Sequence, residues 1–99
     1  AAVEIYDRAL AIDDSDAWTW NGRGLALRAL NRWDEGLESF QYALARDAGA
    51  IWYYHNCGEA WLMLDSPEKA IAVLEAGLAV DPTHDPTRRL LAQARGRLE

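Results

Sequence analysis

Cysteine is almost absent from the sequence, and long apolar runs are absent altogether. The single cysteine, Cys57, cannot form an internal disulfide bond, so the sequence does not require an oxidising compartment. No stretch approaches the roughly 18 consecutive apolar residues of a membrane-spanning helix. We therefore expect a cytoplasmic protein that does not enter a membrane.

Positive charge is also scarce. The 99 residues include 10 Lys and Arg against 16 Asp and Glu, which gives a net charge of −6 and a pI near 4.8. A protein that binds a nucleic-acid backbone needs a basic face, so this balance argues against nucleic acid as a partner. Hydrophobic residues make up 51% of the chain, which argues against disorder. The length fits one domain with one core.

Motifs for catalysis are missing as well. His55 and Glu59 share a helix face, but Cys57 falls on another face. Two candidate ligands are fewer than the three or four that zinc sites use. No glycine-rich phosphate loop, HExxH motif or nucleophile elbow occurs. We therefore predict no catalytic residue, no metal site, no cofactor and no enzymatic activity.

What the sequence does contain is an apolar pattern that returns after 34 residues. A fixed period of this size indicates a stacked array of helical repeats. The pattern also extends toward the N-terminus, since Tyr6 and Ala9 lie one period before Phe40 and Ala43. The matched pairs are Trp20 and Tyr54, Gly24 and Gly58, Leu27 and Trp61, Leu30 and Leu64, Gly36 and Ala70, Phe40 and Leu74, Ala43 and Gly77, and Leu44 and Leu78.

Apolar residues at helical spacing, interrupted by turn residues, predict six helices and no strands. The predicted helices cover approximately residues 2–12, 17–30, 32–46, 51–64, 66–80 and 85–98. Asp16 and Asn31 are the expected N-caps of the second and third helices, and Pro67 marks the start of the fifth. The aspartates that recur once per period at helix ends indicate structural turn positions; they are Asp13, Asp47 and Asp81. This order predicts an all-α stack of antiparallel helix pairs.

The pattern resembles the tetratricopeptide repeat, in which helix A carries Trp-x-x-Leu-Gly-x-x-Tyr and helix B carries Ala-x-x-x-Phe-x-x-Ala. The residues that carry the resemblance are Trp20, Gly24, Leu27, Gly36, Phe40 and Ala43 in one repeat and Tyr54, Gly58, Trp61, Ala70, Leu74, Gly77 and Pro82 in the next. The resemblance implies a right-handed α-solenoid that forms one domain over residues 1–99. It divides into a half repeat (helix B, 1–16), two full repeats (17–50 and 51–84) and a capping helix (85–99).

The same resemblance suggests how the helices pack. Small residues such as Gly24 are expected to let paired helices approach, with aromatic side chains such as Phe40 between them. Arg23 stands where the family usually has leucine, and we expect its head to reach Glu4 or Asp7 on the preceding helix. Because the chain begins without methionine and in the middle of a repeat, we expect it to be part of a longer protein.

The function that the resemblance implies is protein or peptide binding, as part of a scaffold or adaptor. The resemblance implies that the ligand would lie on the concave surface, lined mainly by A helices. The implied groove positions are Trp18, Asn21, Leu25, Arg28, Ala29, Trp52, His55, Asn56, Glu59, Leu62 and Met63. Asn56 is placed where an asparagine often clamps a peptide backbone, because an amide both donates and accepts. The alternative is that Trp18 and Trp52 only cover neighbouring B helices, although their clustering with polar groups favours a site.

In one specialised group of this family, co-chaperone repeats bind the acidic C-termini of chaperones. They do so through a clamp of Lys, Asn, Asn, Lys and Arg. Only Asn56 matches, and the cations that would hold carboxylates are missing. The residues at those positions are Asn21, Leu25, Asn56, Pro86 and Leu90. With Glu59 in the groove of an acidic chain, we expect a neutral or basic partner segment with apolar anchors.

The two ends of the chain carry opposite charge. Residues 1–16 hold five acids and one arginine, a balance of −4, and residues 86–99 hold four arginines and one acid, a balance of +3. These residues are either solvated faces, as most exposed charges are, or surfaces that favour head-to-tail stacking between copies. The alternative function is accordingly a structural segment that self-associates or spaces domains without a peptide ligand. RNA binding, known for related repeats, is opposed by the acidity.

Overall fold

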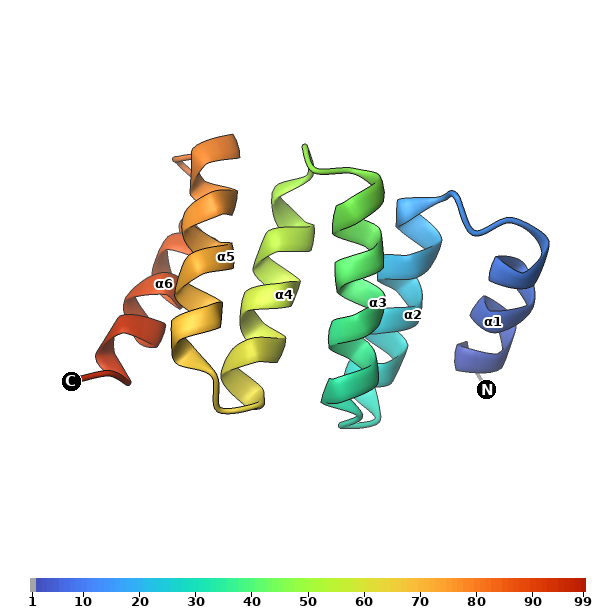
Figure 1. Ribbon diagram of the computed structural model, residues 1–99, viewed down its shortest axis with the longest axis horizontal. Helices are drawn as coiled ribbons and strands as arrows, with labels where there is room; N and C mark the ends of the chain where they lie inside the picture. Colours follow the sequence, from blue (N-terminus) through green and yellow to red (C-terminus); the bar gives the residue numbers. More distant parts are fainter. Residues whose placement is uncertain (1) are drawn as a thin grey trace. The chain divides into compact units, whose positions relative to one another are not determined.

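The computed structural model describes residues 2–99, and every regular element within them is an α-helix (Figure 1). The helices are α1 (Ala2–Ile12), α2 (Ala17–Ala29), α3 (Trp33–Arg46), α4 (Ile51–Met63), α5 (Pro67–Val80) and α6 (Asp85–Gly96). The predicted all-α class with six helices is confirmed, and the observed bounds lie within two residues of the predicted ones. None of the helices formed by these residues is long and apolar enough to cross a membrane.

The helices form two compact units, which meet at the Ala48–Gly49 peptide bond. This bond lies in the turn between the two predicted full repeats. In the first unit, α2 pairs with α3 and α1 packs on α2; in the second, α4 pairs with α5, and α6 packs on α5 and α4. Each unit therefore contains one antiparallel helix pair and one single helix.

The core of the first unit lies between α2 and α3. Phe40, Leu27 and Ala43 are fully buried there. A Cβ atom on Gly24 of α2 would lie inside the van der Waals distance of the Phe40 ring. The absence of a side chain at Gly24 thus lets α2 and α3 approach closely enough to enclose Phe40, as the sequence predicted.

The core of the second unit is built in the same way. A Cβ atom on Gly58 of α4 would collide with Leu74 of α5, which is fully buried. Leu62, expected in the binding groove, belongs to this core instead and is 5% exposed, so that expectation is wrong. The reason is helical phase: Leu62 lies toward the buried side of α4, where it packs with Leu74 and Leu91. The buried core cluster consists of Leu62, Ala70, Leu74, Leu91 and Ala94.

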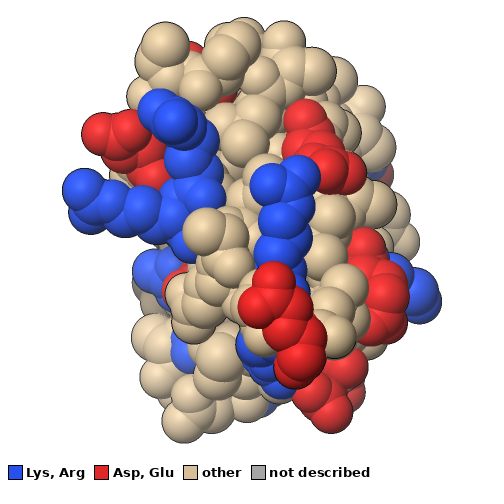
Figure 2. Space-filling model, turned by 90° about the vertical axis from the view of Figure 1, so that its left-hand side faces the viewer, with Lys and Arg blue, Asp and Glu red and all other residues tan. Residues whose placement is uncertain are grey.

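Two arginine side chains near the C-terminal end of the chain bind other parts of the second unit. The Arg95 guanidinium donates to Glu75 of α5 at 2.7 Å. The Arg97 guanidinium donates to the Asp65 carboxylate at 2.6 Å and to the Leu62 carbonyl oxygen at 2.9 Å. Figure 2 looks onto the end that carries α6 and shows basic side chains gathered there beside acidic ones.

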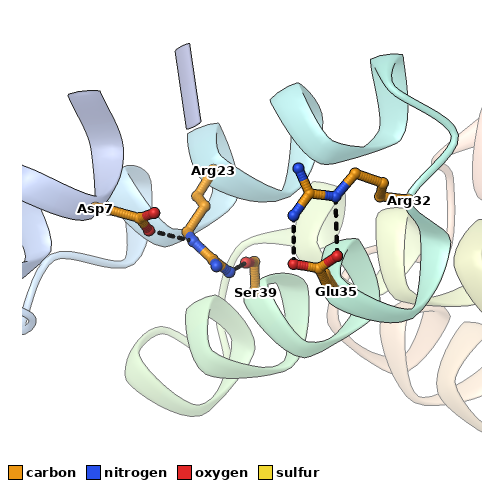
Figure 3. Close-up of polar contacts among 5 residues, drawn as sticks. All are labelled: Asp7, Arg23, Arg32, Glu35 and Ser39. Carbon is orange, nitrogen blue, oxygen red and sulfur yellow. Dashed lines mark hydrogen bonds and ion pairs between the residues drawn. The ribbon is translucent and has the colours of Figure 1, made fainter. Parts of the chain in front are cut away.

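Arg23 joins three helices of the first unit (Figure 3). Its Nε donates to the Asp7 carboxylate of α1 at 2.7 Å, and its Nη1 donates to the Ser39 hydroxyl of α3 at 2.6 Å. Ser39 is fully buried, whereas the Asp7 side chain is about half exposed. The predicted ion pair between Arg23 and the preceding helix is therefore confirmed, with Asp7 as the partner, and Ser39 is an additional one.

The start of α2 follows the prediction, but the start of α3 does not. The Asp16 side chain caps α2 by accepting from the Trp18 backbone N–H at 3.0 Å. Asn31, by contrast, is not the N-cap of α3. It has φ 59° and closes α2, with its N–H donating to the Arg28 carbonyl oxygen, while Arg32 occupies the N-cap position. Asparagine tolerates this left-handed conformation well, which explains its presence at the turn.

Arg32 and Glu35 stabilise the first turn of α3 (Figure 3). The guanidinium donates to both carboxylate oxygens, at 2.9 Å and 2.6 Å. These hydrogen bonds and the Arg32 charge hold the pKa of the Glu35 carboxyl below its usual range. The carboxylate also lies at the helix N-terminus, where the helix dipole favours negative charge.

The backbone of the turns repeats with the same period as the sequence. Asn31 and Asp65, one period apart, have φ 59° and 61°. The C-caps Asp47 and Asp81 have φ, ψ of −147°, 94° and −138°, 90°. Asp81 also accepts hydrogen bonds from the backbone N–H and hydroxyl of Thr83. These aspartates are therefore structural turn residues, as predicted.

Candidate peptide-binding surface

The exposed side of α2 carries a row of apolar residues. Trp18, Leu25 and Ala29 are seven and four residues apart, which places them on one face of the helix. All three are exposed, and Trp18 has 74% of its surface accessible. At this exposure, Trp18 covers little of any neighbouring helix. The row is available for contact with another molecule.

The exposed side of α4 repeats this row one period later. Trp52 corresponds to Trp18, Glu59 to Leu25 and Met63 to Ala29. Trp52 is 52% exposed and Met63 56% exposed, while Glu59 is half-buried between them. The α4 row thus combines two apolar side chains with one carboxylate.

The remaining predicted site residues lie beside these rows and are less accessible. Asn21 of α2 is 7% exposed and Asn56 of α4 is 5% exposed, while Arg28 and His55 are half-buried. All four residues have interactions inside the protein, so none is free. The tryptophans and Met63 therefore offer far more contact surface than the two asparagines.

His84 joins the α4 row although sequence analysis did not select it. The Trp52 ring makes an edge contact with the His84 ring at a centroid distance of 4.5 Å and with His55 at 5.1 Å. The Nδ1 of His84 lies 2.7 Å from the Thr87 hydroxyl, which fixes the ring. His84 precedes α6 in a turn, where helical periodicity gives no information about orientation.

A second aromatic cluster in the first unit was also not predicted. The Trp20 and Tyr42 rings lie 4.5 Å apart, and the Arg46 guanidinium lies 5.3 Å from the Trp20 ring centroid. The Trp20 indole N–H and the Arg46 guanidinium both donate to the Asp14 carbonyl oxygen. The only sequence signal is the spacing of four residues between Tyr42 and Arg46 on α3. These contacts tie the end of α3 to the turn before α2.

Residues that could support metal chemistry do not come together in the described part of the chain. No group of three or more His, Cys, Asp and Glu side chains within residues 2–99 could hold a metal ion. Cys57 is 1% exposed, and burial raises the pKa of its thiol from the usual 9.0 to about 12. A thiol in this state is a poor nucleophile, because the thiolate is the reactive form.

Solved structures that resemble this chain are helical-repeat domains. The second TPR domain of human RPAP3, solved with the HSP70 peptide SGPTIEEVD, has a TM-score of 0.89 at 20% identity, over 94% of this chain and 78% of that chain. The TPR2B domain of yeast Sti1, in complex with an Hsp70 peptide, has a TM-score of 0.88 at 20% identity, over 97% and 82%. The Yersinia enterocolitica secretion chaperone SycD, in complex with a peptide of the translocator YopD, has a TM-score of 0.89 at 14% identity, over 98% and 79%.

These likenesses establish the fold. A scan against protein-family models and a search of curated proteins each find no match. At identities of 14% to 20%, the agreement in structure over nearly the whole chain carries the assignment. The chain has the tetratricopeptide-repeat fold, which confirms the resemblance seen in its sequence.

Proposed function

We propose that this chain is a peptide-binding module of a scaffold or adaptor, and that the exposed rows of α2 and α4 are its contact surfaces. The observation that carries the proposal is the pair Trp18 and Trp52. They occupy the same position one period apart, and both remain largely exposed on helices whose other faces are buried. Exposed aromatic residues with this arrangement mark contact sites, because burying them supplies much of the binding energy.

The chemistry of the rows suggests the kind of ligand. Trp52 and Met63 offer apolar contact on either side of the Glu59 carboxylate. On the α2 row, Trp18 and Leu25 offer apolar contact alone. The chain also carries a net charge of −6. We therefore propose a neutral or basic peptide segment with apolar anchors as the ligand.

Solved structures of the same fold support a peptide ligand in general. The charge of their peptides differs from the neutral or basic charge that we propose for the ligand of this chain. RPAP3 and Sti1 domains of the same fold are solved with HSP70 peptides, of which the RPAP3 peptide ends in the acidic sequence EEVD. In this chain, Asn21, Pro86 and Leu90 replace the three cations of the carboxylate clamp, and Leu25 replaces one of its asparagines. A carboxylate clamp without cations loses its charge-assisted hydrogen bonds. The proposed ligand is accordingly not an EEVD-type C-terminus.

A peptide array followed by calorimetric titration of the selected peptides would test the proposal. The protein is used unmodified and as Trp18→Ala, Trp52→Ala and Asn56→Ala variants with confirmed helicity. We expect selection of basic or neutral peptides with apolar residues. Each tryptophan substitution should weaken binding by about tenfold or more, since truncating such an anchor costs roughly 2 kcal/mol.

A control is Val80→Ala, which removes an exposed apolar side chain of α5 outside both rows. Its affinity should equal that of the unmodified protein. The SGPTIEEVD peptide should bind no better than a scrambled sequence. Binding that is indifferent to both tryptophan substitutions would reject the site, and selective binding of the EEVD peptide would reject the proposed ligand charge.

A further inference from the structure

Both histidines of the 99-residue sequence lie against the same tryptophan. His55 belongs to α4, whereas His84 is the N-cap residue of α6. Their ring centroids lie 5.1 Å and 4.5 Å from that of Trp52 and 6.3 Å from each other, and all three residues belong to the second unit. Any charge that these histidines gain is therefore placed directly beside Trp52.

The packing holds the three rings together and leaves part of the tryptophan accessible. Trp52 is 52% exposed, while both histidines are half-buried. The Nδ1 of His84 lies 2.7 Å from the hydroxyl of Thr87, which is fully buried. The His84 ring is thus held in place beside Trp52, and the exposed part of the indole can still meet a ligand.

The other charged side chains on the surrounding elements belong to residue types that do not titrate with histidine. On α4, Glu59 lies four residues after His55 on the same face, and the tyrosines and the cysteine of this helix are buried. On α6, Asp85 and Arg88 form an exposed ion pair at 3.7 Å. The remaining charged residues of α5, of α6 and of the turn between them are Glu68, Lys69, Glu75, Asp81, Arg89 and Arg95. Side chains of these types keep their charge between about pH 5.5 and 8, whereas histidine changes its charge there.

A cation bound on the Trp52 ring would come close to both imidazoles. Cation–π contacts place the charge within about 6 Å of the ring centroid. Because both imidazole centroids lie within 5.1 Å of the Trp52 centroid, the charges would be about one Debye length apart or less at 0.1 M salt. Neutral imidazoles permit this approach, and protonated imidazoles oppose it by repulsion between like charges.

We propose that His55 and His84 determine the charge that Trp52 accepts, so that cationic groups bind there only while both rings are neutral. At neutral pH a lysine or arginine side chain of the ligand can lie against Trp52, and in mildly acidic solution two imidazolium charges exclude it. This inference rests on the proposed function for the nature of the ligand, a basic peptide segment. Since the bound cation disfavours protonation, the affinity is highest at the alkaline end of the histidine range and falls as the pH decreases.

Fluorescence quenching tests the inference without a known peptide. Caesium ion serves as the cationic probe and acrylamide as the neutral one, at constant ionic strength and at about pH 8 and about pH 5.5. The contribution of Trp52 is the difference between the unmodified protein and a Trp52→Phe variant. We expect the quenching constant of caesium to fall about twofold or more at the lower pH, and that of acrylamide to stay the same. Equal quenching by caesium at both pH values would overturn the proposal.

Two variants identify the groups responsible. His55→Gln with His84→Gln leaves no histidine in the chain and should abolish the pH dependence of caesium quenching. Glu59→Gln, the matched control, removes a carboxylate from the same row and should retain the pH dependence. A pH dependence that persists without histidine, or that disappears with Glu59→Gln, would overturn the proposal.

Nuclear magnetic resonance of the unmodified protein follows both imidazole rings directly and does not depend on the folding of any variant. We expect both rings to gain a proton between about pH 8 and about pH 5.5. Rings that keep the same protonation state over this range would overturn the proposal.

The histidine-free basic peptide with the highest affinity in the array provides a second probe. Its Kd should rise about tenfold from about pH 8 to about pH 5.5 with the unmodified protein, and the ratio should be near one with the double histidine variant. An array without any binding peptide, combined with pH-dependent caesium quenching, would reject the proposed function and support the role of the histidines. A ratio near one for a peptide whose binding requires Trp52 would overturn that role and leave the proposed function intact.

Discussion

Arg23 introduces a charge at a position where repeats of this fold usually carry leucine, and its surroundings show how the charge is accommodated. The side chain is 15% exposed, with its guanidinium between a half-exposed carboxylate and a buried hydroxyl. A buried hydroxyl without a partner costs free energy, whereas a hydrogen bond to a charged group stabilises it. Arg23 and Ser39 therefore depend on each other.

This dependence predicts a non-additive pair of substitutions. Arg23→Leu should lower the free energy of unfolding by about 1–3 kcal/mol, because Ser39 is left buried and unpaired. Ser39→Ala in the same background should recover most of this loss. Urea unfolding of both single variants and the double variant measures the coupling, with Asp7→Asn as a control that should cost less than about 1 kcal/mol. A stabilising effect of Arg23→Leu alone would contradict the interpretation.

Sequence reasoning found part of this network for a physical reason. The resemblance to the repeat family placed Arg23 at a position that is usually leucine, and Asp7 was one of two expected partners on the preceding helix. Ser39 was missed because its role depends on the depth at which α3 packs on α2, which spacing does not give. His84 was missed for a related reason, since it lies in a turn, where no periodicity orients the side chain.

At the scale of the helix, the distance of closest approach is controlled by small residues. Gly24 and Gly58 allow their partner helices to enclose Phe40 and Leu74. Gly96, at the end of α6, has no atom within 4 Å of where its Cβ would be. Close packing therefore requires glycine in α2 and α4, whereas no neighbouring atom requires it at the end of α6.

We expect Gly24→Ala to lower the free energy of unfolding by about 1–3 kcal/mol, because the new methyl group overpacks against Phe40. Gly96→Ala should raise it by up to about 1 kcal/mol, because alanine loses less conformational entropy in a helix. Thermal and urea unfolding of both variants provides the measurement. Equal effects of the two substitutions would show that contact with Phe40 is not what requires glycine.

The helix boundaries were predicted well because their signals are local. Asp16 was recognised as an N-cap, and the prolines near the starts of α5 and α6 stop the chain from continuing in the previous helix. Asn31 was assigned to the wrong helix, since an asparagine before a helix satisfies the patterns of an N-cap and of a left-handed residue equally well. Its equivalence with Asp65 becomes evident only from the backbone angles.

At the scale of the whole molecule, the chain contains two units with separate buried centres. Stability in repeat proteins is a sum of local terms and contacts between neighbours, so a defect in one unit need not open the other equally. Cys57 provides a probe of the second unit, because burial and a pKa near 12 keep its thiol unreactive until local opening exposes it.

Labelling of Cys57 with a thiol reagent under native conditions should therefore distinguish the units. Gly58→Ala, which disturbs the packing of α4 on Leu74, should accelerate labelling by tenfold or more, as expected for a loss of about 1.4 kcal/mol. Gly24→Ala, in the first unit, should accelerate it much less. Equal acceleration would indicate that both units open in one cooperative step.

The candidate binding residues show the limit of repeat register as a guide. The register gives Trp18 and Trp52 equivalent positions in the repeat, and the structure leaves both side chains exposed. It did not distinguish them from Leu62, Asn21 and Asn56, which the structure buries. The degree of burial depends on how closely neighbouring helices approach, and that distance is set by the glycines described above.

The matching turn angles have a consequence for how such a chain can be lengthened. Asp16, Ala50 and His84, the residues before α2, α4 and α6, have ψ values of 111°, 110° and 97°. A copy of residues 17–50 inserted after residue 50 would therefore begin and end on backbone geometry that the neighbouring segments already have. Duplication of this segment in the gene would add a further tryptophan-bearing row, and the new junctions would need no new backbone geometry. The number of such rows can therefore change readily in evolution.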